Sequence, residues 1–164
     1  MKRLVTLIST LTLAASSFFM PAVFAQSASS DAVAANKALL EKYVAAKNNR
    51  DLSKMAEIYV DNYIENTGRN PSGLAAVTEN WRGQFQAIPD IKVILEDAVI
   101  TGDKVVARIT YTGTHTVPFF AGIPPTGKPF KLGTIDIWRV SGGKFVEHWD
   151  QVDFAGLQRQ LMAK

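Results

Sequence analysis

Two kinds of hydrophobic periodicity divide the chain between residues 31 and 161. In the first part, apolar residues recur every three or four positions, which is typical of amphipathic helices. This spacing predicts three helices, over Asp31–Asn48, Asp51–Ile58 and Ser72–Pro89. A single short strand, Tyr59–Asn66, is expected between the second and third helices.

In the second part the period changes to two, which is typical of strands that bury one face. Four strands and a closing helix are predicted there: Ile91–Ile100, Val105–Thr116, Phe130–Val140, Lys144–Val152 and a helix through Leu157 and Leu161. Helices followed by consecutive antiparallel strands predict an α+β domain whose helices cover one face of a curved sheet. A sheet bent strongly over a long helix forms a cone, and its open mouth is a natural pocket for a small molecule.

The first 25 residues have the three parts of a secretory signal. Lys2 and Arg3 precede the apolar stretch Leu4–Phe19, and Pro21 is followed by small residues ending at Ala25. We therefore expect cleavage after Ala25, a flexible leader over 26–30, and one domain over 31–164. A retained membrane anchor of about 20 residues is the alternative. The mature protein is expected to be soluble and exported, in the periplasm or outside the cell, with no membrane partner.

Composition narrows the classes of partner and chemistry. The 164 residues are 47% hydrophobic and 20% charged, as expected for a globular domain. Without Lys2 and Arg3, the 18 basic residues fall to 16 against 15 acidic ones, so nucleic acid is a poor candidate partner. There is no cysteine, which excludes disulfides and thiolate chemistry. The two histidines are His115 and His148, so a zinc site would need carboxylates, and we expect neither a metal nor a cofactor.

Polar residues interrupt the apolar faces of the last two strands. Asp136 and Trp138 share one face, and His148 and Asp150 share one face of the next strand. A two-residue turn would place Asp136 beside Glu147 instead. A three-residue turn, Ser141–Gly143, would bring Asp136 and Trp138 to the same face as His148 and Asp150. We favour the three-residue turn, because a glycine at its end supplies the positive φ that such a turn needs.

In that register two carboxylates and an imidazole line one apolar wall. A buried carboxylate can act as a base near neutral pH, and two neighbouring carboxylates separate their titrations. The alternative is that His148 and Asp150 are structural polar residues or face solvent.

Other candidate pocket residues come from neighbouring segments. The apolar face of Val105–Thr116 would aim Tyr111 and His115 at the cavity; the alternative for His115 is a strand-end histidine bonded to the following loop. Asn66 is either a pocket residue or a turn residue before Gly68. Three aromatic residues complete the expected binding wall: Trp81, Phe119 and Phe120. Trp81 also suits the core, whereas Phe119 and Phe120 suit a lid or a dimer contact.

Four stretches together resemble one family: Tyr111–Thr116, Gly122–Gly127, Ile135–Arg139 and Val146–Asp150. Their order and spacing are similar to those of the SnoaL-like polyketide cyclases, or ester cyclases, of the nuclear transport factor 2-like superfamily. The resemblance runs from about residue 36 to residue 161. It implies a cone-shaped, cystatin-like α+β barrel with a curved, mixed sheet, often assembled as a dimer.

The resemblance also implies a chemistry. These cyclases close a ring by cofactor-independent aldol condensation, with a pocket aspartate as general acid and base. That role would carry to Asp150, and Asn66 matches a polar pocket position. Asp136 stands where the cyclases often have histidine, so the partner that stabilises the enolate differs. Export separates this chain from the cytosolic intermediates of antibiotic pathways, so polyketide cyclisation is not transferred as its reaction.

Four functions therefore remain in competition. The leading one is acid/base chemistry on a small apolar carbonyl compound, with Asp150 as base and His148, His115 or Asp136 stabilising the enolate oxygen. The second is a non-catalytic periplasmic protein that binds an apolar molecule. The third is an epoxide-type hydrolase in which a carboxylate activates water, and a metal-dependent enzyme is a distant fourth. The exposed face of a curved sheet predicts a homodimer.

Overall fold

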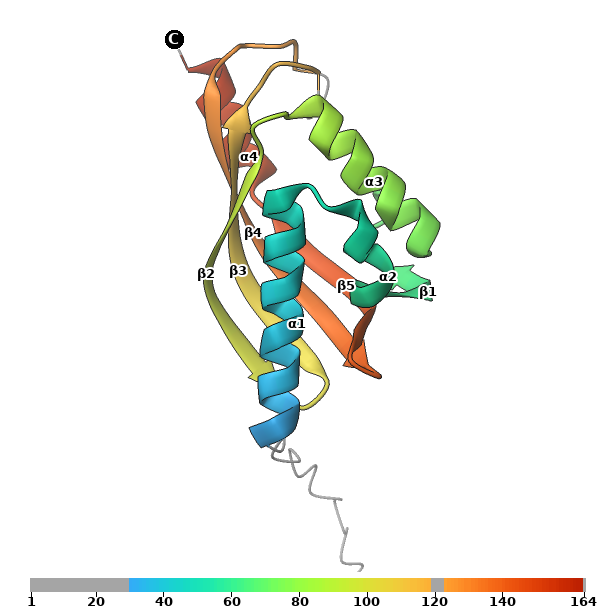
Figure 1. The fold of residues 1–164 in the computed structure, drawn as a ribbon. Coiled ribbons are helices and arrows are strands. Elements are labelled where there is room, and N and C mark those ends of the chain that lie inside the picture. Colours follow the sequence, from blue (N-terminus) through green and yellow to red (C-terminus); the bar gives the residue numbers. More distant parts are fainter. Residues whose placement is uncertain (1–29, 119–122, 164) are drawn as a thin grey trace, which may run out of the picture.

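Helices precede a run of four strands in the computed structural model, which describes residues 30–118 and 123–163. The α+β class predicted from the change of periodicity is confirmed (Figure 1). Its elements, including one 3₁₀ turn (η1), are α1 (Ser30–Asn49), η1 (Leu52–Lys54), α2 (Met55–Ile58), β1 (Tyr59–Glu65), α3 (Leu74–Ala87), β2 (Lys92–Thr101), β3 (Lys104–Thr114), β4 (Pro129–Ser141), β5 (Lys144–Val152) and α4 (Phe154–Met162).

The five strands form one mixed sheet in the order β1-β5-β4-β3-β2. The last four strands are antiparallel neighbours, whereas β1 runs parallel to β5 at one edge. Extra residues interrupt the pairing at Glu96 in β2 and Val146 in β5. Such bulges bend a strand and increase its twist, which is how the sheet acquires its curvature.

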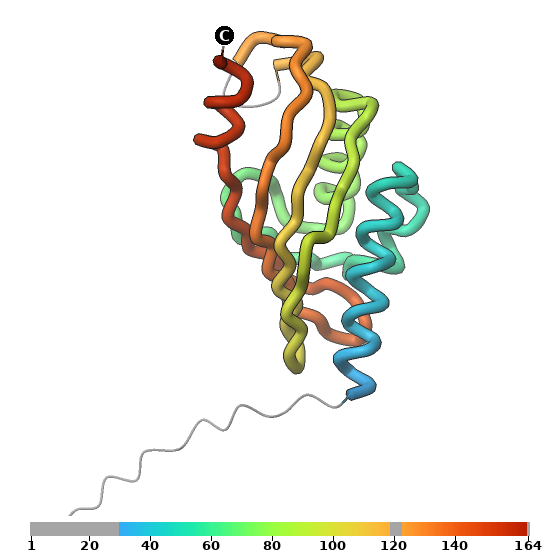
Figure 2. Tube along the Cα trace, turned by 90° about the vertical axis from the view of Figure 1, so that its left-hand side faces the viewer, coloured from blue at the N-terminus to red at the C-terminus, as the bar shows by residue number. Residues whose placement is uncertain are grey.

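Helices α1 and α3 cover the concave face of the sheet, and α4 lies beside β4 (Figure 2). Helix α1 packs along β2 and β3, α3 lies over the β1 side, and α4 packs against β4. Figures 1 and 2 show α4 at the opposite end of the molecule from the start of α1. Alternation along β4 is nearly perfect: Phe130, Leu132, Thr134, Asp136 and Trp138 are buried, and the residues between them are exposed or half-buried.

Side chains at the end of α1 fasten this helix to its neighbours. Asn48 donates to the carbonyl of Val93 and accepts from its amide, so it acts as a hydrogen-bonding partner for β2. Arg50 ends the helix with a positive φ of 57° and donates to the carbonyl oxygens of Phe85 and Pro89. These bonds hold α1 and α3 at a fixed separation, which sets the width of the space between them and the sheet.

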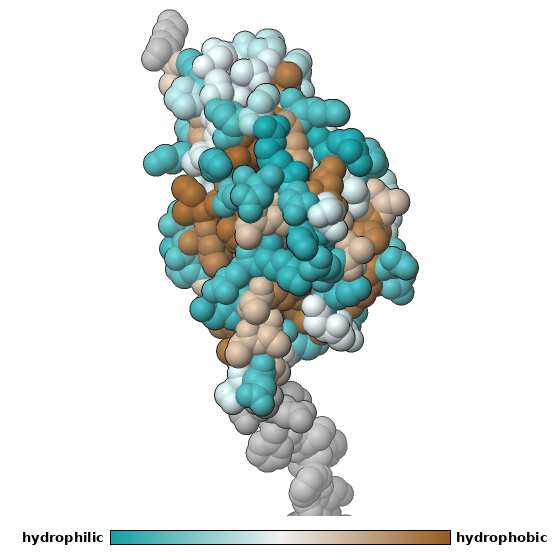
Figure 3. Space-filling view, in the orientation of Figure 1, coloured by the Kyte–Doolittle hydropathy of each residue, from teal (hydrophilic) through white to brown (hydrophobic). Residues whose placement is uncertain are grey.

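The surface mixes polar and apolar residues. Hydrophilic side chains predominate across the middle of the face shown in Figure 3, and hydrophobic ones gather toward its sides. Ile94 and Ile135 are each 46% exposed, on strands of the sheet. Within the described residues, no helix combines the length and hydrophobicity that crossing a membrane would require.

Candidate active site

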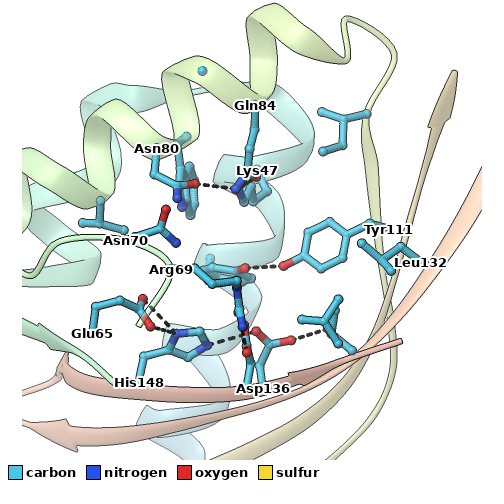
Figure 4. Close-up of a pocket in the computed structure, with 18 of the residues that line it drawn as sticks. Lys47, Glu65, Arg69, Asn70, Asn80, Gln84, Tyr111, Leu132, Asp136 and His148 are labelled. Carbon is cyan, nitrogen blue, oxygen red and sulfur yellow. Dashed lines mark hydrogen bonds and ion pairs between the residues drawn. The ribbon is translucent and has the colours of Figure 1, made fainter. Parts of the chain in front are cut away.

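A cavity of about 500 Å³ lies between the concave face of the sheet and the helices α1 and α3 (Figure 4). One part of its wall is aromatic and apolar, with Tyr43, Trp81 and Phe130 among its residues. The other part carries charged side chains from β1, β4, β5 and the loop before α3. Substrate-sized cavities in proteins are commonly built in this way, with a few polar groups in an otherwise apolar wall.

A buried three-residue network forms the floor of the cavity. His148 Nδ1 lies 3.1 Å from both carboxylate oxygens of Glu65, and its Nε2 lies 3.0 Å from Asp136 Oδ1 (Figure 4). The hydroxyl of Thr134 donates to the other oxygen of Asp136. Since an ionised carboxylate only accepts hydrogen bonds, both ring nitrogens of His148 carry a hydrogen and the ring is an imidazolium.

This protonation state follows from a balance between burial and charge. Burial lowers the pKa of His148, but the hydrogen bonds and negative charges of Asp136 and Glu65 outweigh it and raise the pKa to about 9. Burial likewise acts to raise the pKa of Glu65, and the contacts with His148 and Thr67 leave that pKa lowered. Near neutral pH the imidazolium of His148 is therefore held between the carboxyl groups of Glu65 and Asp136.

Asp150 lies next to this network and has a different kind of partner. It is paired with Asp136 across the β4–β5 ladder, and its carboxylate accepts hydrogen bonds from the guanidinium of Arg69. The side chain of Asp150 is 9% exposed, whereas that of Arg69 is 40% exposed and comes from the loop between β1 and α3. The partners of Asp136 are thus fixed in the core, but the partner of Asp150 is a displaceable side chain at the rim.

The hairpin between β4 and β5 brings Asp136 and Asp150 to one face, but the predicted three-residue turn is wrong. The turn has two residues, Gly142 and Gly143, both with positive φ, and pairs Val140 with Phe145. The extra residue is instead Val146, a bulge inside β5 that shifts the register by one. The bulge changes the parity, so Asp136 still faces Asp150.

A lysine occupies another part of the cavity wall, beneath α3. Lys47 is 2% exposed, and its Nζ donates to Gln84 Oε1 and lies 4.2 Å from the ring centroid of Trp81. Figure 4 shows it on the opposite side of the cavity from Asp136 and His148. Burial lowers the pKa of Lys47 to about 7, although the charge of Asp136 acts in the other direction.

Three of the aromatic residues predicted for binding do line the cavity: Tyr111, Trp138 and Trp81. The hydroxyl of Tyr111 lies 2.8 Å from that of Tyr43, and Trp138 stacks on His148 with ring centroids 5.3 Å apart. Trp81 serves the core and the cavity wall together, being 3% exposed. The predicted lid residues Phe119 and Phe120 lie outside the described residues.

Two predicted site residues are not in the cavity wall. His115 is buried just beyond β3, where its Nδ1 accepts from the amide of Thr126 and contacts its hydroxyl. The alternative interpretation, a histidine bonded to the following loop, therefore describes it. Asn66 is exposed, with its amide 3.4 Å from Glu147 Oε1. The amide of Asn66 still donates to the carbonyl of His148, but strand alternation turns its side chain away from the inner face on which Glu65 lies.

The cavity residues that the sequence prediction missed include Glu65, Lys47 and Arg69. Glu65 is two residues after the buried Tyr63, so strand alternation would have placed both on the inner face. Lys47 follows Leu39 and Tyr43 at intervals of four, on the buried face of α1. Arg69 comes from an irregular loop, for which neither periodicity gives a signal.

One cluster in the described part of the chain has the composition of a metal site. Asp136, His148 and Asp150 each place a potential ligand atom within 4.8 Å of the others. Both ring nitrogens of His148 are already bonded to carboxylates, and Asp150 is paired with Arg69. A metal would have to displace these partners and a proton, so the donor set fits an acid/base network better than a cation.

Comparison with known proteins assigns this architecture to a protein family. The family model of the SnoaL-like polyketide cyclases matches residues 37–161, which include every residue of the network. The chain belongs to this family. Membership agrees with the curved mixed sheet and its covering helices, which form a nuclear transport factor 2-like fold.

Several solved structures from the genus Streptomyces are similar to this family member. TsrD from Streptomyces laurentii is 34% identical, with a TM-score of 0.73 over 80% of this chain and 97% of TsrD. AclR from Streptomyces galilaeus, assigned as a hydroxylase, is 31% identical, with a TM-score of 0.68 over 79% of this chain and 85% of AclR. IdmH from Streptomyces antibioticus, assigned as a polyketide cyclase, is 29% identical, with a TM-score of 0.66 over 76% of this chain and 96% of IdmH. Among the curated proteins, none is similar enough to match.

Proposed function

We propose that this chain binds a small apolar carbonyl compound in the cavity and performs cofactor-independent acid/base chemistry on it. The reaction would be an aldol-type cyclisation or an isomerisation, with Asp150 as the base. One observation carries the proposal: among the described residues, the cavity carboxylate of Asp150 bonds only to an arginine at the rim, and it lies next to the buried network of Glu65, His148 and Asp136. Family membership supports the reaction class, and the different activities assigned to AclR and IdmH leave the substrate open.

Arg69 is the group best placed to stabilise the enolate oxygen. Both N–H groups of His148 are used by Glu65 and Asp136, and His115 lies outside the cavity wall. The guanidinium of Arg69, in contrast, loses its charged partner at the moment when Asp150 takes a proton. The developing oxyanion then replaces Asp150 as the anionic partner of the arginine.

The proposed steps conserve atoms and charge. Asp150 removes a proton from the carbon next to the carbonyl, and the C–H electron pair moves to form a carbon–carbon double bond and an enolate oxygen. In a cyclisation, the enolate carbon then attacks a second carbonyl carbon of the same molecule, and the alkoxide that forms takes the proton back from Asp150. In an isomerisation, the enolate is conjugated with a carbon–carbon double bond, and Asp150 returns the proton to the far carbon of that system. Glu65, His148 and Asp136 remain unchanged and hold the carboxylate of Asp150 in a fixed electrostatic environment.

The test compares the compounds that the wild type and Asp150→Asn retain after expression and export. Each protein is denatured, and the released compounds are compared by liquid chromatography with accurate mass, with Asp97→Asn as an exposed control. Compounds of equal mass and different retention support the proposal. A mass difference of one water supports hydrolysis. The same compound in both proteins supports the second candidate, a binding protein, which the aromatic wall of the cavity also suits.

The proposal places the mature protein outside the cytoplasm, after removal of residues 1–25. Mass spectrometry of the protein from the periplasm or medium tests this, and a mature chain beginning at Gln26 is the expected result. The proposal also includes a homodimer through the exposed face of the sheet, supported by the exposure of Ile94 and Ile135. Sedimentation of wild type and Ile135→Lys tests it, since a charge on that face should shift the mass from dimer to monomer.

A further inference from the structure

Lys47 is a buried amine in the cavity that the proposed chemistry does not use. It comes from the last turns of α1, is 2% exposed, and projects beneath α3. Its Nζ has one hydrogen-bond acceptor, Gln84 Oε1, and otherwise faces the rings of Trp81 and Phe85, at 4.2 and 5.6 Å from their centroids. Among the residues that the structure describes, no carboxylate forms an ion pair with it.

These surroundings disfavour the charged form of the amine. A buried ammonium needs a counter-charge or several acceptors, and Lys47 has one neutral acceptor. The ring of Trp81 at 4.2 Å attracts the ammonium, but more weakly than a paired carboxylate would. In contrast, the described lysines that form ion pairs lie at the surface, as Lys42 does with Glu57 at 3.0 Å. The lowered pKa of Lys47, about 7, agrees with this contrast and leaves roughly half of the amine neutral at neutral pH.

We propose that Lys47 forms a Schiff base with an aldehyde or ketone that enters the cavity. A neutral lysine in an apolar pocket is the activated form of this nucleophile. The cavity reaches solvent beside Arg69, whose side chain is 40% exposed, so a carbonyl compound has access from the rim. A Schiff base at Lys47 does not require Asp150 to be a base, because the amine lies across the cavity from Asp136 (Figure 4), the residue paired with Asp150 in the sheet.

The reaction is a condensation without a redox step. The lone pair of Nζ attacks the carbonyl carbon, and proton transfer from nitrogen to oxygen gives a carbinolamine. Loss of its hydroxyl with the second amine proton, as one water, leaves the carbon–nitrogen double bond. Gln84 Oε1 keeps the amine oriented during the attack by accepting one of its hydrogens.

The experiment traps the imine as a stable adduct. The exported mature protein is incubated with benzaldehyde and sodium cyanoborohydride between pH 6 and pH 9, and lysine modification is measured by peptide mapping. We expect Lys47 to be modified at limiting aldehyde, with a rate that levels off above about pH 7. The exposed Lys42 should react more slowly at pH 7, because its ammonium is held in the charged form by water and by Glu57 at 3.0 Å.

Two variants control for the position of the amine. Lys47→Met keeps the aliphatic volume and should abolish the limiting-aldehyde adduct, whereas Lys42→Met should retain it. The proposal is overturned if folded wild-type protein modifies Lys47 no faster than Lys42. Because the decisive measurement uses the wild type, it is independent of how well either variant folds and of any change at Asp150.

Discussion

The charged state of His148 predicts how the stability of the protein depends on pH. In the folded chain the pKa of His148 is raised to about 9, and an unperturbed histidine in the unfolded chain has a pKa near 6.5. At about 1.4 kcal/mol per pH unit, that difference corresponds to about 3 kcal/mol of folding free energy. Since the folded pKa is the higher one, the contribution is fully present below pH 6.5 and is lost as pH rises through about 9.

Lys47 produces the opposite slope in an overlapping window. Its pKa is lowered to about 7 in the folded chain, so the unfolded chain binds more protons above that pH and stability rises toward pH 10. The wild type alone therefore shows a partly cancelled pH dependence. The contribution of His148 appears only as the difference between wild type and a variant that lacks the imidazole.

The assay is urea unfolding of wild type and His148→Gln at pH 5.5 and pH 10, followed by tryptophan fluorescence. We compare the difference in unfolding free energy between wild type and variant at the two pH values. This difference should be about 3 kcal/mol larger, in favour of the wild type, at pH 5.5 than at pH 10. NMR titration should place the imidazole of His148 near pH 9. A constant difference between the two proteins, together with titration of His148 near 6.5, would show that the ring is not held as an imidazolium by Glu65 and Asp136.

Three further substitutions test other contacts, each by urea unfolding. Lys47→Met should raise stability at pH 6 and remove the rise between pH 7 and pH 10, because the buried amine no longer has to be charged. Gly113→Ala should cost about 1–3 kcal/mol, because the added Cβ would meet Ile88 Cγ2 at 2.4 Å; unchanged stability would mean that α3 and β3 are less tightly packed. Asn48→Ala should cost about 1–3 kcal/mol by leaving the amide and carbonyl of Val93 unpaired, and a neutral effect would count against that bond pair.

Periodicity predicted the order of helices and strands because the core imposes it directly on the sequence. The alternation of β4 illustrates this, since each inward position from Phe130 to Trp138 is buried. It also put Asp136 and Trp138 on one face of β4, and His148 and Asp150 on one face of β5, as the structure has them. These predictions depend only on which side of a strand a residue lies, a property that the sequence records locally.

Features that depend on irregular backbone could not be predicted in the same way. The register of β4 and β5 is set by a bulge at Val146 rather than by the length of the turn, and no residue type marks that bulge. The partnership of Arg69 with Asp150 joins a loop to a strand across 81 positions of sequence. The network of Glu65 and His148 likewise requires β1 to pair with the last strand, a non-local contact that local patterns do not specify.

Removal of a carbon-bound proton by Asp150 is the central claim, and deuterium exchange tests it most directly. The compound released from the wild-type cavity is incubated in D₂O with wild type, Asp150→Asn or the exposed control Asp97→Asn, and its mass is followed with time. Wild type and control should introduce deuterium at the carbon next to the carbonyl, whereas Asp150→Asn should be slower by about 10²–10⁴. Equal exchange with all three proteins, or none with wild type, would contradict the assignment of Asp150 as the base.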